Sequence, residues 1–122
     1  MAELPGVIMK TEYDTYQINV AGIKTFWKNE SQHDVAYGEY FELYKNNDEV
    51  WTKLEDISGS PYPSIGYGLD IGAECEKTYM ISERFGVLDA GDYRIYIEYL
   101  ATINGKSPRL AIFAEFSILE NA

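Results

Sequence analysis

The side chains that could support nucleophilic or metal chemistry in this sequence are few. There is one histidine, His33, and one cysteine, Cys75, and they lie far apart in the chain. Nucleophilic catalysis needs a base beside the nucleophile, and no serine lies in a Gly-x-Ser-x-Gly motif. One histidine and one cysteine do not make the four-ligand set that zinc requires. We therefore expect no catalytic residues, metal site or cofactor, and we expect His33 to lie in a solvated loop.

Carboxylates are more numerous, and two pairs have close spacing. Glu74 is near Glu76, and Asp89 is near Asp92. A glycosidase needs two carboxyl groups that face each other across a cleft. Calcium binding of the EF-hand type needs an Asp-x-Asp-x-Asp-Gly loop, which is absent. The sequence favours solvated strand faces and a tight turn for these carboxylates, and not an active site.

Tyrosine is the residue type in surplus, with eleven in the chain. Tyr40 and Tyr44 are predicted on the outward face of one strand and Tyr96 on the outward face of another. Exposed tyrosines stack on sugar rings and anchor protein interfaces, so these three form a candidate ligand-binding face. The alternative is that cross-strand aromatic pairs stabilise the sheet. A coplanar, exposed trio would favour sugar binding, and burial of the rings would remove it.

The strand that carries Tyr96 organises the rest of the chain. Residues 89–92, Asp-Ala-Gly-Asp, have the composition of a tight turn. In residues 93–99, the odd-numbered side chains form an apolar strand face and the even-numbered ones form a mixed face. Leu88, Gly91 and Tyr93 match the tyrosine corner of Greek-key sandwiches. In antibody domains a cysteine follows the corner tyrosine by two residues, but this chain has Ile95 there. We expect hydrophobic packing in place of an inter-sheet disulfide.

About seven strands are predicted, which is typical of an all-β, immunoglobulin-like Greek-key β-sandwich. They span residues 7–13, 22–29, 37–45, 50–54, 76–82, 93–99 and 110–118. Residues 14–19 are predicted as a loop, residues 83–86 as one helical turn, and residues 56–72 as irregular with only short strand pieces. The length suits one domain, which we place at residues 7–120. Residues 1–6 are expected to be an N-terminal tail or a cloning remnant.

Charge and composition limit the classes of partner. The net charge of −10 argues against nucleic acid, because phosphate binding requires clustered lysine and arginine. No apolar run is long enough to span a bilayer, so we expect no membrane insertion by this domain. An exposed edge strand at residues 7–13 or 110–118 could pair with a second copy of the chain. The sequence thus leaves an edge-strand homodimer open.

Several segments together resemble a family of bacterial immunoglobulin-like domains. They are Val7–Tyr13, Lys28–Ser31, Tyr37–Leu43 with Trp51, Glu76–Tyr79, Leu88–Ile95 and Phe113–Ile118. The resemblance implies a module of secreted or lipid-anchored surface proteins of Gram-positive and gut bacteria, and it implies no enzymatic activity. It carries over no functional residue. We expect a non-catalytic structural or protein-interaction module, extracellular or anchored at the cell surface; the alternative is a carbohydrate-binding module that uses the tyrosine face.

Overall fold

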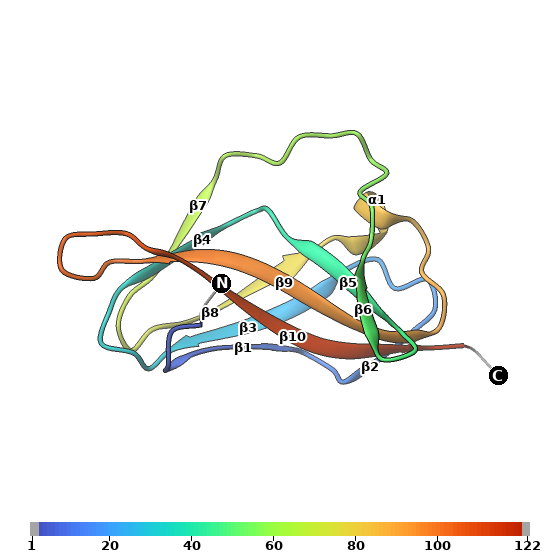
Figure 1. Ribbon diagram of the computed structural model, residues 1–122, viewed down its shortest axis with the longest axis horizontal. Coiled ribbons are helices and arrows are strands. Elements are labelled where there is room, and N and C mark those ends of the chain that lie inside the picture. Colours follow the sequence, from blue (N-terminus) through green and yellow to red (C-terminus); the bar gives the residue numbers. More distant parts are fainter. Residues whose placement is uncertain (1–2, 121–122) are drawn as a thin grey trace.

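The computed structural model describes residues 3–120, which form two β-sheets packed face to face (Figure 1). The small sheet has the order β1 (Val7–Thr11), β3 (Ile23–Asn29), β8 (Glu74–Tyr79). The large sheet has the order β2 (Thr15–Gln17), β10 (Arg109–Leu119), β9 (Gly91–Ala101), β4 (Val35–Gly38), β7 (Gly66–Leu69). β5 (Glu42–Asn47) also pairs with β9, and β6 (Val50–Lys53) pairs with β5. One short helix, α1 (Ile81–Phe85), precedes the corner.

Strict alternation builds the core between the sheets, because successive strand residues point to opposite faces. In β9, Tyr93, Ile95, Ile97 and Tyr99 are buried, as the sequence predicted. Trp27 of β3 lies opposite them and is also buried. The prediction of an immunoglobulin-like β-sandwich without a disulfide is confirmed, and Cys75 is a free thiol.

The tyrosine corner is present where it was predicted. The Tyr93 hydroxyl donates a hydrogen bond of 2.6 Å to the backbone carbonyl of Asp89, and the ring is buried. Burial, together with the nearby Asp89 carboxylate, raises the pKa of Tyr93 to about 12. Leu88 packs on the core, and Gly91 begins β9. The phenol therefore remains a neutral donor that ties the loop before β9 to the strand.

The predicted loop at residues 14–19 contains a strand that the sequence did not reveal. β2 pairs in parallel with the end of β10, so that Thr15 faces Ser117 and Gln17 faces Leu119. The pairing is extended by a backbone hydrogen bond of 2.8 Å from Ser117 N to Asp14 O. The chain thus crosses from the small sheet, which it leaves after β1, to the large sheet. A three-residue strand is too short to show a hydrophobic period.

Residues 37–45, predicted as a single strand, span parts of two strands, β4 and β5. Tyr37 of β4 faces Tyr99, whereas Glu42 of β5 faces Tyr96, so the link from β4 to β5 contains extra residues that bulge out of the ladder with β9. Odd-numbered residues still point inward on both sides of the bulge. The alternation therefore continues through the break, and the sequence pattern did not reveal it. The bulge projects Tyr40 from the sheet.

A buried asparagine joins the sheets at one end of the sandwich. Asn29, the last residue of β3, has no exposed surface. Its Nδ2 donates to the carbonyls of His33 at 2.7 Å and Leu69 at 3.0 Å, and its Oδ1 accepts from the backbone N and the hydroxyl of Ser31. Every polar atom of this side chain thus has a partner, which burial requires. His33 contributes its backbone to this network.

The irregular stretch before β7 is held by one arginine. The Arg84 guanidinium of α1 lies 3.7 Å from the ring centre of Tyr62 and donates to the carbonyls of Ser60 and Pro61. The same group donates to the Asp56 carboxylate at 3.3 Å. A guanidinium can do this because it has five donors and a flat face. This segment is therefore packed against α1 rather than extended as a strand.

Two tight hairpins close the large sheet. The turn between β9 and β10 has Asn104 and Gly105 at φ 51° and 74°, and the turn between β5 and β6 has Asp48 and Glu49 at φ 53° and 68°. Both central residues have positive φ in each turn, as in a type I′ turn. Asn-Gly suits this geometry, but a glutamate in the left-handed region is strained.

Replacing Glu49 with glycine is expected to raise the free energy of unfolding by about 1 kcal/mol, because glycine adopts positive φ without steric cost. Glu49 is exposed at the tip of the turn. Urea denaturation of the variant measures the change. Glu49→Ala is the matched control, since it removes the same carboxylate but leaves an L-residue at φ 68°, and it should give no gain. Equal stability of the two variants would contradict the strain.

Candidate functional site

Aromatic side chains gather on the outer face of the large sheet. This aromatic face consists of Tyr40, Tyr44, Trp51, Tyr96 and Phe113. They come together because β6, β5, β9 and β10 are neighbours, with Tyr96 directly opposite Phe113. Residues on neighbouring strands that share one face lie within side-chain reach.

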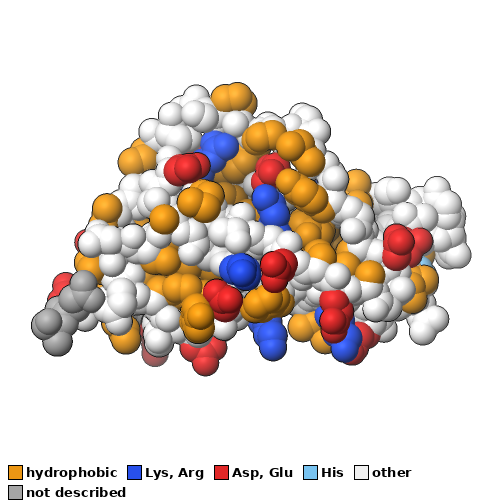
Figure 2. All heavy atoms as spheres, turned by 180° about the vertical axis from the view of Figure 1, so that it is seen from behind, with side chains coloured by type: hydrophobic (Ala, Val, Ile, Leu, Met, Phe, Trp, Pro, Cys, Tyr) orange, Lys and Arg blue, Asp and Glu red, His pale blue; other side chains and the backbone are white. Residues whose placement is uncertain are grey.

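The outer face of the small sheet is different. Lys24 pairs with Glu12, and Lys28 pairs with both Glu30 and Glu74. Figure 2, seen from behind, shows basic and acidic side chains next to each other on this side. Such exposed pairs contribute little to stability, and they keep a surface soluble. The two faces of the sandwich are therefore chemically unequal, and the aromatic face is the candidate site.

The three tyrosines predicted as a ligand-binding face all lie on the aromatic face, but they are not coplanar. Tyr44 and Tyr96 are half-buried and pack edge to face, with ring centres 6.0 Å apart at 70°. Tyr40 is 40% exposed and forms a T-shaped pair with Tyr62, with ring centres 4.9 Å apart at 71°. The Tyr44–Tyr96 pair is the cross-strand aromatic contact that the alternative interpretation describes. Of the three, only Tyr40 is exposed.

Glu42 lies between two of these tyrosines. Its carboxylate accepts hydrogen bonds from the hydroxyl of Tyr40 at 2.6 Å and that of Tyr44 at 2.7 Å, and Lys53 Nζ lies 3.7 Å away. Burial raises the pKa of Glu42, but the two hydroxyls and Lys53 outweigh it, so the pKa lies below its usual value. Burial and the bond to Glu42 raise the pKa of Tyr44 to about 12. At neutral pH, Glu42 is therefore an ionised acceptor between neutral phenols.

Acidification should destabilise the fold through Glu42. A carboxylate whose pKa is lower in the folded state contributes stability above its unfolded pKa of about 4.3, and this stability is lost as the pH falls through the folded value. We expect the free energy of unfolding to fall below about pH 5, and to fall less steeply in Glu42→Gln. Urea denaturation across a pH series measures both slopes. Parallel curves for the two proteins would show that Glu42 does not contribute.

Arg94 packs against two members of the aromatic face, Trp51 and Phe113. The Arg94 guanidinium lies 4.0 Å from the Trp51 ring centre and 4.4 Å from that of Phe113, and its Nε is 3.4 Å from the Glu115 carboxylate. This cluster is not evident from the sequence. Alternation placed Arg94 on the outward face with Tyr96, but bringing Trp51 and Phe113 to it required the strand order.

The side chains that the sequence offered for catalysis contact other side chains of the fold. The Cys75 sulfur is 3.0 Å from the Tyr37 hydroxyl. Asp92 accepts a hydrogen bond from Ser117, whereas Asp89 is 4.0 Å from Lys45. Within residues 3–120, no three histidine, cysteine, aspartate or glutamate side chains converge as metal ligands. The same residues contain no helix with the length and apolar character needed to cross a membrane.

The family of the chain is shown by its sequence. Residues 3–116 match the family model described as bacterial Ig-like domain. The chain belongs to this family. The resemblance inferred from the turn residues and core aromatics is thus confirmed. No curated protein matches this Ig-like domain.

Three solved structures are similar to this Ig-like domain at low sequence identity. The Pseudomonas fluorescens alkylpurine DNA glycosylase AlkC, bound to DNA containing an abasic site analog, is 12% identical, with a TM-score of 0.43; the match covers 97% of this chain but only 31% of AlkC. The ASH/PapD-like domain 7 of human CEP192 is 10% identical, with coverage of 99% and 90% and a TM-score of 0.41. The CooA pilin subunit of enterotoxigenic Escherichia coli is 14% identical, with coverage of 94% and 99% and a TM-score of 0.34.

Proposed function

We propose that this Ig-like domain is a non-catalytic structural module, a spacer, in a bacterial surface or secreted protein, carried outside the cell by a signal or lipid anchor. The observation that carries the proposal is the placement of the chain ends. The Leu4 backbone N donates to the Tyr99 hydroxyl at 2.8 Å, whereas Leu119 faces Gln17 beyond the Gly91 end of β9. The eight residue steps from Gly91 to Tyr99 correspond to about 27 Å. Segments joined to the two ends would be held apart by this length.

The contacts of the polar side chains support a structural role. Asn29, Arg84 and Tyr93 each hold a loop against the sandwich through short hydrogen bonds. A catalytic group instead needs a free face toward a substrate and a pKa suited to proton transfer. The Cys75 sulfur instead contacts the Tyr37 hydroxyl at 3.0 Å, and the backbone carbonyl of His33 accepts hydrogen bonds from Asn29 and Ser31.

Labelling of intact cells tests the location. In the bacterium that produces the protein, a membrane-impermeant amine reagent should modify the exposed lysines Lys10, Lys53 and Lys106 before lysis, or the protein should be recovered from the medium. A cytoplasmic protein in the same cells is the control and should remain unlabelled. Modification only after lysis, with none of the protein in the medium, would contradict an extracellular module.

Self-association through an edge strand stays a prediction. β1 is at the edge of the small sheet, and β10 pairs with β2 only at Ser117–Leu119. The two strands lie side by side where the sheets meet, so a second copy would have to reach one of these partly covered edges. Sedimentation velocity over a concentration series tests the homodimer, and a monomer at every concentration would contradict the prediction.

The domain limits at residues 7–120 also stay a prediction. Leu4 packs against the core, and Gly6 accepts a hydrogen bond from the backbone N of Glu30 at 2.7 Å. These contacts attach residues of the predicted tail to the sandwich, while Met1 and Ala2 lie outside the described residues.

A further inference from the structure

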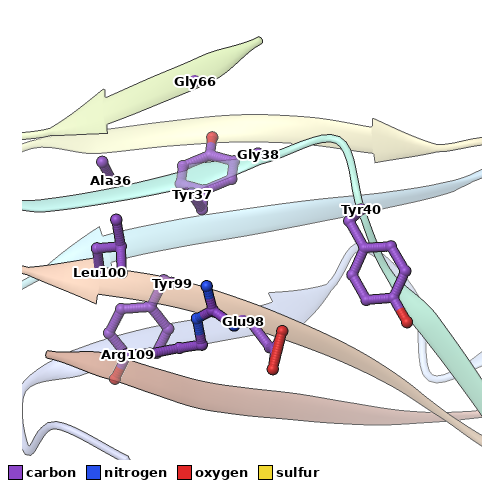
Figure 3. A pocket seen from close by; sticks show the side chains of 9 residues that line it. All are labelled: Ala36, Tyr37, Gly38, Tyr40, Gly66, Glu98, Tyr99, Leu100 and Arg109. Carbon is purple, nitrogen blue, oxygen red and sulfur yellow. The ribbon is translucent and has the colours of Figure 1, made fainter. Parts of the chain in front are cut away.

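A hollow of about 370 Å³ lies on the large sheet beside the bulge that projects Tyr40 (Figure 3). Tyr40 stands at one side, Glu98 and Arg109 reach in from β9 and β10, and Leu100 lies beside them. Gly38 and Gly66 contribute backbone without side chains. A Cβ at Gly66 would meet no atom within 4 Å, so the wall is open here. The volume is within the range of small-molecule sites.

The hollow contains two charged groups, Glu98 and Arg109. The other basic residues of this face are paired, Lys53 with Glu42 and Arg94 with Glu115. Among residues 3–120, neither Glu98 nor Arg109 takes part in an ion pair. The hollow therefore has an acceptor-only carboxylate and a donor-only guanidinium, both available to a ligand.

We propose that this hollow binds one ring of a neutral oligosaccharide. Sugar hydroxyls both donate and accept hydrogen bonds, so adjacent hydroxyls can donate to Glu98 and accept from Arg109. The exposed Tyr40 ring supplies the apolar surface against which a pyranose stacks. An acidic sugar fits less well, because the Glu98 carboxylate offsets the Arg109 guanidinium within the hollow and the chain has a net charge of −10. The site is a different one from the Tyr40, Tyr44, Tyr96 trio, since Tyr44 and Tyr96 do not line it.

The test is a titration of ¹⁵N-labelled protein with cellohexaose, xylohexaose, mannohexaose and chitohexaose, with trigalacturonate as the acidic comparison. At least one neutral hexasaccharide should shift amide signals around residues 36–40, 66, 98–100 and 109, with a Kd on the order of 1 mM or lower. Tyr40→Ala should raise this Kd about tenfold, and Glu98→Gln and Arg109→Ala should raise it by a similar factor.

Tyr44→Ala is the matched control. It removes the other phenol that donates to Glu42 but leaves the hollow intact, so it should keep the wild-type Kd. The proposal is overturned if no neutral hexasaccharide shifts these signals at about 10 mM, if trigalacturonate binds there more tightly, or if Tyr44→Ala weakens binding as much as Tyr40→Ala does. These outcomes leave the spacer proposal standing, because the spacer role needs no ligand.

Discussion

Replacing Asn29 with alanine is expected to lower the free energy of unfolding by about 3 kcal/mol or more. The substitution removes a hydrogen bond from each of four groups: the carbonyls of His33 and Leu69, and the backbone N and hydroxyl of Ser31. Only the contacts between the Ser31 hydroxyl and the backbone of His33 remain of the side-chain network at this end of the sandwich. Groups buried without a hydrogen bond cost about 1–3 kcal/mol each, and partial access to water reduces the sum. Urea denaturation at neutral pH measures the loss.

Two further variants, one in the same network and one control, complete the test. Ser31→Ala removes one member of the same network and should cost about 1–2 kcal/mol, so it reports on the network even if the Asn29 variant does not fold. Asn47→Ala is the control on an exposed asparagine and should stay within about 0.5 kcal/mol of the wild type. Equal effects at Asn29 and Asn47 would mean that the buried network does not stabilise the fold.

The second large loss of stability is expected when Trp27 is replaced. Its ring lies parallel to that of Tyr37 with centres 4.3 Å apart, and its Nε1 donates to the Thr25 hydroxyl at 3.0 Å. That hydroxyl in turn donates to the Lys77 carbonyl at 2.7 Å, which ties β3 to β8. Trp27→Ala removes the stack and the hydrogen bond and opens a cavity, so it should cost about 3–5 kcal/mol.

The second tryptophan of the chain provides the comparison. Trp51 is half-buried on the aromatic face, and its main contact is the Arg94 guanidinium. Trp51→Ala should cost about 1 kcal/mol. Trp27→Phe, which keeps most of the ring, should cost less than Trp27→Ala and keeps the prediction testable if the alanine variant is unfolded. A larger loss at Trp51 than at Trp27 would contradict the assignment of the core.

The parts of the fold that the sequence predicted have local signals. β9 alternates over its whole length, and the tyrosine corner lies within six residues, Leu88 to Tyr93. The parts that it missed depend on pairing between distant segments. β2 exists because residues 15–17 lie beside residues 117–119, and the bulge before β5 preserves the inward position of odd-numbered residues, so the pattern is unchanged across it.

For the candidate site, the sequence predicted which strand face each residue lies on, but not which residues are neighbours. Alternation placed Tyr44 and Tyr96 outward, and in the structure both are half-buried on the outer face of the large sheet. Alternation does not give register, so it could not show that Glu42 accepts from two tyrosines or that Arg94 stacks on Trp51. Asn29 was predicted only as a strand end before a turn, because no local pattern distinguishes a buried asparagine from a turn asparagine.

The distance between the two ends of the domain tests the proposed spacer role. Spin labels on cysteines at the exposed positions Glu3 and Glu120, in a Cys75→Ser background, report it by pulsed electron paramagnetic resonance. For a spacer, one narrow distribution centred at roughly 27 Å or more is expected, because β9 separates the two ends. A distribution centred at half that value or less would place both ends together and contradict a spacer.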